Sequence, residues 1–99
     1  MDALFGDDVK GFIDRSLKGW TFDNNTIRRE FRFRNFVEAF SFMTAVGMEA
    51  EKIDHHPDWS NTFNRVTITL STHSAGGVTN KDFDLAGKID AVYNNYIRS

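Results

Sequence analysis

Side chains that can transfer protons are concentrated in one short segment, EKIDHHPDWSNTF, residues 51–63. It holds His55 and His56 side by side, followed directly by Pro57, the only proline of the chain. The third histidine, His73, follows the run VTITLST. An imidazole titrates at about pH 6.5, so neutral and protonated rings coexist near neutral pH and can act as base and acid. The residue types therefore indicate acid–base chemistry.

The proline gives the two adjacent histidines different directions. Pro57 fixes its own φ angle and pushes His56 toward an extended backbone. Because neighbouring side chains of an extended chain point to opposite sides, the imidazoles of His55 and His56 should not act as an equivalent pair. A histidine just after a helix is also commonly only a partner for the helix end, and the sequence leaves that alternative open.

Two carboxylates are candidates to border the same space. Glu51 lies in the last turn of a predicted helix, four residues before the first histidine, and Asp82 lies in the first turn of the last predicted helix. Each has a simpler explanation, since Glu51 can be a solvated charge and Asp82 follows Thr79 with the spacing of a capping box. Trp59 and Phe63 are candidates for a pocket wall or for the core.

Other catalytic chemistries have less support in the sequence. The chain has no cysteine, and no serine stands in a recognisable nucleophile motif. A zinc site made by His55, His56 and His73 is a weaker alternative, because adjacent histidines chelate one metal poorly and the HExxH pattern is absent. The segment SAGGVT lacks the lysine of a phosphate-binding loop. We therefore expect no metal, and the chain carries no recognisable nucleotide-binding motif.

Three segments have the apolar spacing of amphipathic helices. The first covers residues 8–18 and stops at Gly19. The second follows the capping-box pair Asn35 and Glu38, and the third follows Thr79. The broad apolar face of the second helix consists of Phe36, Ala39, Phe40, Phe42, Met43, Val46 and Ala50.

Two predicted hairpins lie between these helices. Residues 20–33 alternate around a tight turn at Asn24–Asn25, and the strand at 65–72 pairs with the run at 58–62. The order α-β-β-α-β-β-α predicts an α+β fold, a two-layer sandwich whose four-stranded antiparallel sheet has helices on one face. The other face, rich in Thr and Arg, is solvated or an oligomer surface. The segment HSAGG reads as a flexible connection, and His73 should reach the sheet end that carries the other histidines.

Composition limits the classes of function. The 99 residues form a single predicted domain, 1–99, with a globular apolar fraction of 40%. No apolar run could span a bilayer and the start MDALFGDDVK is unlike a signal peptide, so we expect a cytoplasmic protein without membrane partners. The net charge of −2 argues against a nucleic-acid partner. Arg28, Arg29, Arg32 and Arg34 make that a weaker alternative, because Glu30 interrupts their row.

Seven residues at fixed spacing resemble the signature of the pterin-4a-carbinolamine dehydratases. They are Glu51, His55, His56, Pro57, an aromatic residue at Phe63, His73 and Asp82. The text KIDHHPDWSNTFNRVTITLSTHSAGGVTNKDFDLAGKID is similar to that family almost throughout, whereas the N-terminal half agrees mainly in element order. Phe63 stands where a tyrosine is common, which removes a hydroxyl group and keeps the ring.

The resemblance implies a lyase without a cofactor. Such enzymes dehydrate 4a-hydroxytetrahydropterin, the product of an aromatic amino acid hydroxylase, to quinonoid dihydropterin. The C4a hydroxyl must gain a proton and N5 must lose one. By the same resemblance His55 and His73 are the acid–base groups and His56 mainly binds and orients the substrate. Glu51, the fourth catalytic residue that it implies, orients a histidine or raises the pKa of that histidine through its negative charge. The implied substrate-binding residues are Asp54, His55, His56, Trp59, Phe63, Ser71, Thr72, His73 and Ser74, supported by Pro57 and Asp82.

The resemblance also implies partners. Besides the pterin substrate and functional coupling to a hydroxylase, it implies a homodimer or homotetramer formed by helix and sheet-edge contacts. Family members in animals also serve as dimerisation cofactors of a homeodomain transcription factor. The alternative function is therefore a protein-interaction module, or transcriptional coactivator, that does not require catalysis.

Overall fold

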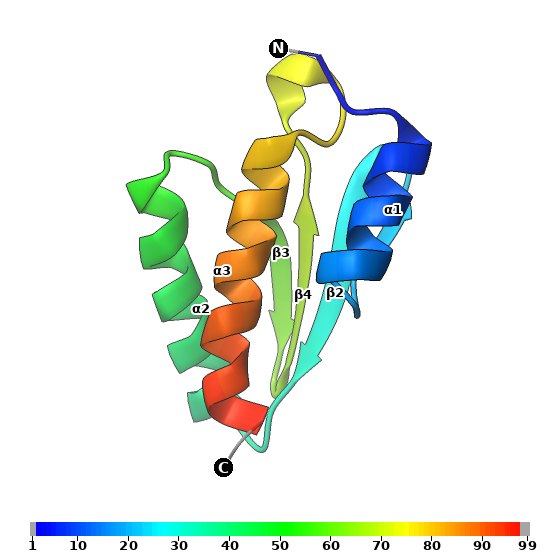
Figure 1. Cartoon of the computed structure of the whole chain (residues 1–99). Helices are drawn as coiled ribbons and strands as arrows, with labels where there is room; N and C mark the ends of the chain where they lie inside the picture. Colours follow the sequence, from blue (N-terminus) through cyan, green and yellow to red (C-terminus); the bar gives the residue numbers. More distant parts are fainter. Residues whose placement is uncertain (1, 98–99) are drawn as a thin grey trace.

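The computed structural model describes residues 2–97 and confirms the predicted α+β sandwich. Three α-helices cover one face of a four-stranded sheet (Figure 1). The elements are α1 (Gly6–Ser16), β1 (Thr21–Asp23), β2 (Thr26–Arg32), α2 (Phe36–Lys52), β3 (Asp58–Thr62), β4 (Arg65–Leu70), the 3-10 helix η1 (His73–Ala75) and α3 (Asn80–Ile97). Their order is the predicted one, with η1 in addition.

The sheet has the strand order β1-β2-β4-β3, and all neighbours are antiparallel. Both predicted hairpins are confirmed. Asn24 and Asn25 adopt the left-handed φ angles of 50° and 61° that a tight hairpin turn requires. In the second hairpin Asp58 pairs with Thr69, so the start of β3 lies beside the end of β4. This register sets which residues stand near His73.

The core lies between the sheet and the helices. Ile27 and Phe31 of β2 are fully buried, and the ring of Phe31 packs against Phe42 of α2 and Tyr93 of α3 at centroid distances of 4.9 Å each. The alternating residues of β4, Val66, Ile68 and Leu70, are buried on the same face. Burial of these side chains fixes the strand register, because a slip by one residue would expose all of them.

Three local predictions need correction. α1 ends at Ser16, so Lys18 lies beyond its last turn; Gly19 adopts a left-handed φ of 104° further along. Phe36 and Phe40 were expected on the apolar face of α2, yet they are 45% and 57% exposed. The face that α2 buries is narrower, because its contacts come from one sheet face and from α3. The segment HSAGG is also ordered, as η1 followed by Gly76 at φ 74°.

A half-buried carboxylate ties α3 to the first hairpin. Asp90 accepts hydrogen bonds from Trp20 Nε1 at 2.9 Å and from Arg29 Nη1 at 2.9 Å. The Arg29 guanidinium also lies 4.8 Å from the ring centre of Phe31. Burial raises the pKa of Asp90 above its ordinary value of 3.8, although its hydrogen bonds with Trp20 and its interactions with Arg29 act in the opposite direction.

We predict that the stability contributed by Asp90 falls as pH rises. Because its pKa is raised in the folded state, its contribution is full below about pH 4 and is lost as pH rises through the raised pKa. The free energy of unfolding of the wild type should therefore decline relative to that of Asp90→Asn as pH rises above about 4. Urea unfolding of both proteins across this range is the measurement. The opposite slope would mean that the Arg29 ion pair outweighs burial.

Candidate active site

The end of α2 fixes where His55 leaves the helix. Asp54 adopts a left-handed φ of 51° and its N–H donates to Glu51 O at 3.2 Å. The N–H of His55 donates to Ala50 O at 3.1 Å. These two bonds are those of a Schellman motif, in which glycine is usual and a short polar residue is tolerated at the left-handed position. The backbone of His55 is therefore bonded to the last turn of the helix.

His55 meets a buried carboxylate from the neighbouring helix α3. Its Nε2 lies 2.6 Å from Oδ1 of Asp82, which is 27 residues further along the chain in the first turn of α3. The side chain of His55 is 11% exposed and that of Asp82 is 0% exposed. A buried carboxylate needs hydrogen bonds in place of water, and this histidine supplies one of them.

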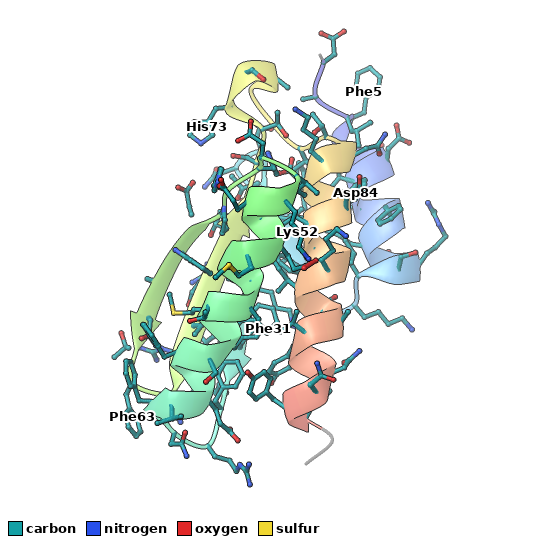
Figure 2. The ribbon with its side chains drawn as sticks, turned by 90° about the vertical axis from the view of Figure 1, so that its left-hand side faces the viewer. Phe5, Phe31, Lys52, Phe63, His73 and Asp84 are labelled. Atoms are coloured by element: carbon teal, nitrogen blue, oxygen red, sulfur yellow. The ribbon has the colours of Figure 1, made fainter. Side chains whose placement is uncertain are left out.

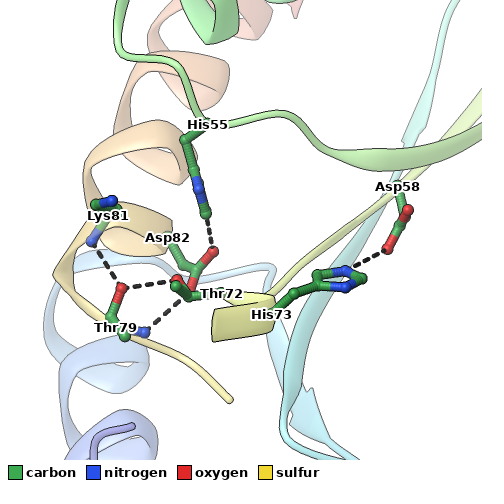
Figure 3. A network of polar contacts seen from close by, with 7 residues as sticks. All are labelled: His55, Asp58, Thr72, His73, Thr79, Lys81 and Asp82. Atoms are coloured by element: carbon green, nitrogen blue, oxygen red, sulfur yellow. Dashed lines mark hydrogen bonds and ion pairs between the residues drawn. The ribbon is translucent and has the colours of Figure 1, made fainter. Parts of the chain in front are cut away.

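Two threonines complete the surroundings of Asp82 (Figure 3). Its Oδ2 accepts a hydrogen bond from Thr79 N at 2.9 Å and one from Thr72 Oγ1 at 2.9 Å. Thr79 Oγ1 in turn accepts from Lys81 N at 3.2 Å. The bond from Thr79 N to Asp82 is the half of a capping box that the sequence predicts for Asp82, whereas Thr79 Oγ1 caps Lys81 N in place of Asp82 N. Asp82 is thus both a helix cap and the partner of His55.

These contacts define which nitrogen of His55 carries a proton. All partners of Asp82 can donate to it, which suits an ionised carboxylate. Nε2 of His55 must then be the donor, so a neutral ring has its lone pair on Nδ1. Within residues 2–97, Nδ1 has no hydrogen-bond partner. Asp82 therefore orients an imidazole that can accept a proton on its free side.

His73 stands at the same end of the sheet in a different setting. It begins η1, its side chain is 85% exposed, and Nε2 lies 3.9 Å from Oδ2 of Asp58 at the start of β3. Figure 3 shows His73 and His55 on facing segments, with Asp58 beyond His73. Sequence reasoning missed Asp58. The signal was available in the strand register, because the residue opposite Thr69 lies at the sheet end where β4 leads into His73.

His56 is exposed and contacts a second, solvated carboxylate. Its Nε2 lies 2.8 Å from Oε1 of Glu51, and the two side chains are 56% and 78% exposed. The expectation that the adjacent imidazoles differ is confirmed: His55 is held by a buried carboxylate and His56 by a solvated one. Glu51 therefore contacts His56, and Asp82 is the acidic residue that contacts His55.

Two shallow hollows lie near this end of the sheet, and one of them includes His73. One of about 290 Å³ is lined by Asn24, Asn25, Thr26, Ser71, Thr72, His73, Gly76 and Gly77. Another of about 320 Å³ lies on the open sheet face and is lined by Arg28, Asp58, Trp59, Ser60, Thr67 and Thr69. Their volumes are at the low end for small-molecule sites, which begin at about 300 Å³. Ser71 is half-buried and Ser74 exposed, whereas the Thr72 side chain is turned into the protein.

The two aromatic candidates separate in the structure. Trp59 is 36% exposed, and its ring lies beside Gly47 of α2. Phe63 lies at the far tip of the second hairpin, with a φ of 50°, at the end of the molecule opposite His73 (Figure 2). The rise of a strand carries Phe63 about 16 Å beyond Asp58. Phe63 therefore does not join the histidines within this chain.

The weaker alternatives gain no support from the described part of the chain. Among residues 2–97, no three His, Asp or Glu side chains converge as metal ligands would. Arg29, Arg32 and Arg34 each form an ion pair, with Asp90, Glu30 and Glu38 respectively. A phosphate backbone would have to compete for these partners. Within the same residues, no helix has the length and apolar character to span a membrane.

Comparison with known proteins identifies the family. The pattern of the family described as Pterin 4 alpha carbinolamine dehydratase matches residues 3–92. The chain belongs to this family. It is 49% identical over 87 residues to a protein of Prochlorococcus marinus (strain NATL2A), covering 88% of this chain and 90% of that protein. It is 50% identical over 78 residues to one of Solibacter usitatus (strain Ellin6076), covering 79% and 82%. Both are provisionally named pterin-4-alpha-carbinolamine dehydratases.

Solved structures agree with this membership. A transcriptional coactivator/pterin dehydratase from Brucella melitensis superposes with a TM-score of 0.89 at 40% identity, covering 93% of this chain and 99% of that one. A pterin dehydratase-like protein described as a RuBisCO assembly factor has a TM-score of 0.63 at 19% identity and covers 75% and 86%, so it shares the fold. The resemblance found in the sequence is confirmed at the level of the family.

We predict that Asp82→Asn changes both stability and the tautomer of His55. The amide oxygen can still accept from Thr79 N and Thr72 Oγ1, but the negative charge that strengthens these bonds is lost, at a cost of about 1–3 kcal/mol in free energy of unfolding. If the amide nitrogen faces His55, the ring must accept at Nε2 and move its proton to Nδ1. Urea unfolding and nitrogen-15 NMR of the imidazole measure the two effects. Asp84→Asn, an exposed change two residues away, is the control; equal effects of both variants would contradict the prediction.

Proposed function

We propose that this protein dehydrates 4a-hydroxytetrahydropterin to the quinonoid dihydropterin by histidine acid–base catalysis. The observation that carries the proposal is the hydrogen bond of 2.6 Å between His55 and the buried Asp82, at the sheet end where His73 is exposed. The site therefore has one nearly buried imidazole held by a carboxylate and one exposed imidazole on a facing segment. Family membership supplies the substrate class, since the relatives' names refer to pterin-4-alpha-carbinolamine.

The geometry suggests how the work is divided. His55, with its proton on Nε2 held by Asp82, accepts the N5 proton of the substrate on Nδ1, and the resulting imidazolium is stabilised by the carboxylate. His73, exposed and beside Asp58, is the protonated ring that donates to the C4a hydroxyl, which leaves as water. The N5–C4a double bond forms as the C–O bond breaks. Proton exchange with solvent then restores both rings, so no cofactor is consumed.

Binding groups surround these two rings. We place the flat pterin against the backbone of residues 54–56 and 71–74, with Trp59 as a wall and His56, held by Glu51, as an orienting group. The substrate would be supplied by a cytoplasmic aromatic amino acid hydroxylase, because that reaction leaves the 4a-hydroxy product.

We predict that the wild type accelerates dehydration and that His73→Ala loses at least about tenfold in kcat, the lower range of one acid–base group. His56→Ala should raise KM more than it lowers kcat, because an orienting group acts mainly on binding. Ultraviolet absorbance of enzymatically generated 4a-hydroxytetrahydropterin follows the decay. A folded wild type that leaves the spontaneous rate unchanged would contradict the proposal.

A second candidate function, a protein-interaction module, is favoured by one surface. Phe36, Val37, Phe40 and Met48 form an exposed apolar stripe along α2, 45–71% accessible. The Brucella melitensis structure is named a coactivator as well as a dehydratase. If interaction were the main function, His73→Ala would leave it intact. We propose that the α2 stripe is used first of all for a homodimer or homotetramer of this chain.

We predict that Phe40→Glu dissociates this oligomer. A charge in the middle of an apolar contact must be desolvated without a partner, which disfavours association. Sedimentation velocity should show a smaller mass than for the wild type. Phe5→Glu is the matched control, because Phe5 is 81% exposed at the start of α1 and lies apart from the stripe (Figure 2). An unchanged mass for Phe40→Glu would place the contact elsewhere.

A further inference from the structure

Thr72 lies between two parts of the site, the turn that carries His73 and the hydrogen-bond network of Asp82 and His55. It follows β4 and directly precedes His73, and it is 4% exposed. Its carbonyl oxygen accepts hydrogen bonds from the N–H groups of Ala75 and Gly76 at 3.0 Å each, and its own N–H donates to Gly77 O at 2.7 Å. The backbone of Thr72 therefore closes the turn that carries His73.

The side chain of Thr72 takes part in the hydrogen-bond network around Asp82. Its hydroxyl donates its single proton to Oδ2 of Asp82 at 2.9 Å, since a carboxylate only accepts. The contact of 2.8 Å with Thr79 Oγ1 must then run from Thr79 to Thr72. Lys81 N donates to Thr79 Oγ1, Thr79 Oγ1 donates to Thr72 Oγ1, and Thr72 Oγ1 donates to Asp82. All three hydrogen bonds therefore run toward the carboxylate. Such a chain of aligned hydrogen bonds is mutually strengthening.

We propose that Thr72 is a positioning residue that couples the two histidines. Its hydroxyl holds Oδ2 of Asp82 jointly with the N–H of Thr79, so that Oδ1 stays aimed at Nε2 of His55. The same residue holds the turn of His73. The spacing of the two rings is then set through one buried side chain. This role rests on the proposed dehydration, although the hydrogen-bond geometry itself does not.

The burial of Thr72 separates this role from substrate binding. A side chain that is 4% exposed, with its hydroxyl inside the network, presents no group to a ligand. Loss of the hydroxyl should therefore lower kcat and leave KM nearly unchanged. A displacement of catalytic groups by about 1 Å can slow a reaction by about 100-fold.

The test compares Thr72→Val, which has the same shape without a hydroxyl, with Thr72→Ser, which keeps the hydroxyl. Thr72→Val should lower kcat at least about tenfold with KM within about twofold. Thr72→Ser should recover most of the rate. Thr62→Val is the matched control, since Thr62 is exposed at the far end of β3, next to Phe63. Equal kcat for Thr72→Val and wild type, or a serine variant as slow as the valine variant, would overturn the proposal.

A second readout does not depend on activity. The Nε2 proton of His55, held by Asp82, should give a low-field imidazole resonance in proton NMR, assigned by its loss in His55→Asn. It should be displaced in Thr72→Val, restored in Thr72→Ser and unchanged in Thr62→Val. If the wild type lacks dehydratase activity while these shifts occur, the proposed function fails and the positioning role stands. If the resonance has the same chemical shift in Thr72→Val as in the wild type, the positioning role fails, whether or not the protein is an active dehydratase.

Discussion

The site depends on one carboxylate that has been removed from water. Asp82 is 0% exposed, and a charge there is tolerated only where hydrogen bonds replace solvent. Thr79, Thr72 and His55 supply them from the start of α3, the segment after β4 and the loop after α2. Satisfying this single group therefore brings three distant parts of the chain together, and the orientation of His55 follows from that requirement.

α3 is anchored to the rest of the molecule by two carboxylates, one fully buried and one half-buried. Asp82 faces the histidine end, and Asp90, about 12 Å further along the helix axis, accepts from Trp20 and Arg29. Between them the apolar residues Leu85 and Ile89 are fully buried. Apolar burial supplies the main driving force for packing α3 on the sheet, while the two polar anchors restrict its rotation and its shift along the axis.

Much of the fold follows from local patterns in the sequence. Asn35 and Thr79 do mark helix starts, and the left-handed turn at Asn24–Asn25 does close a hairpin, because capping and turn chemistry act within a few residues. The alternation in β4 predicted its buried face for the same reason. Where the patterns failed, as for Phe36 and Phe40, an apolar residue stands on a helix face that no other part of this chain covers.

The sequence by itself determined the elements, their order, the family and the residue types of the candidate site. Only the tertiary structure decided which acid meets which imidazole: Asp82 for His55, Glu51 for His56 and Asp58 for His73. It also carried Phe63 to the opposite end of the molecule. Local rules extend over one helical turn or one hairpin, whereas His55 and Asp82 are 27 residues apart. Their contact is set by how α2 and α3 pack on the sheet, and spacing along the chain does not encode that packing directly.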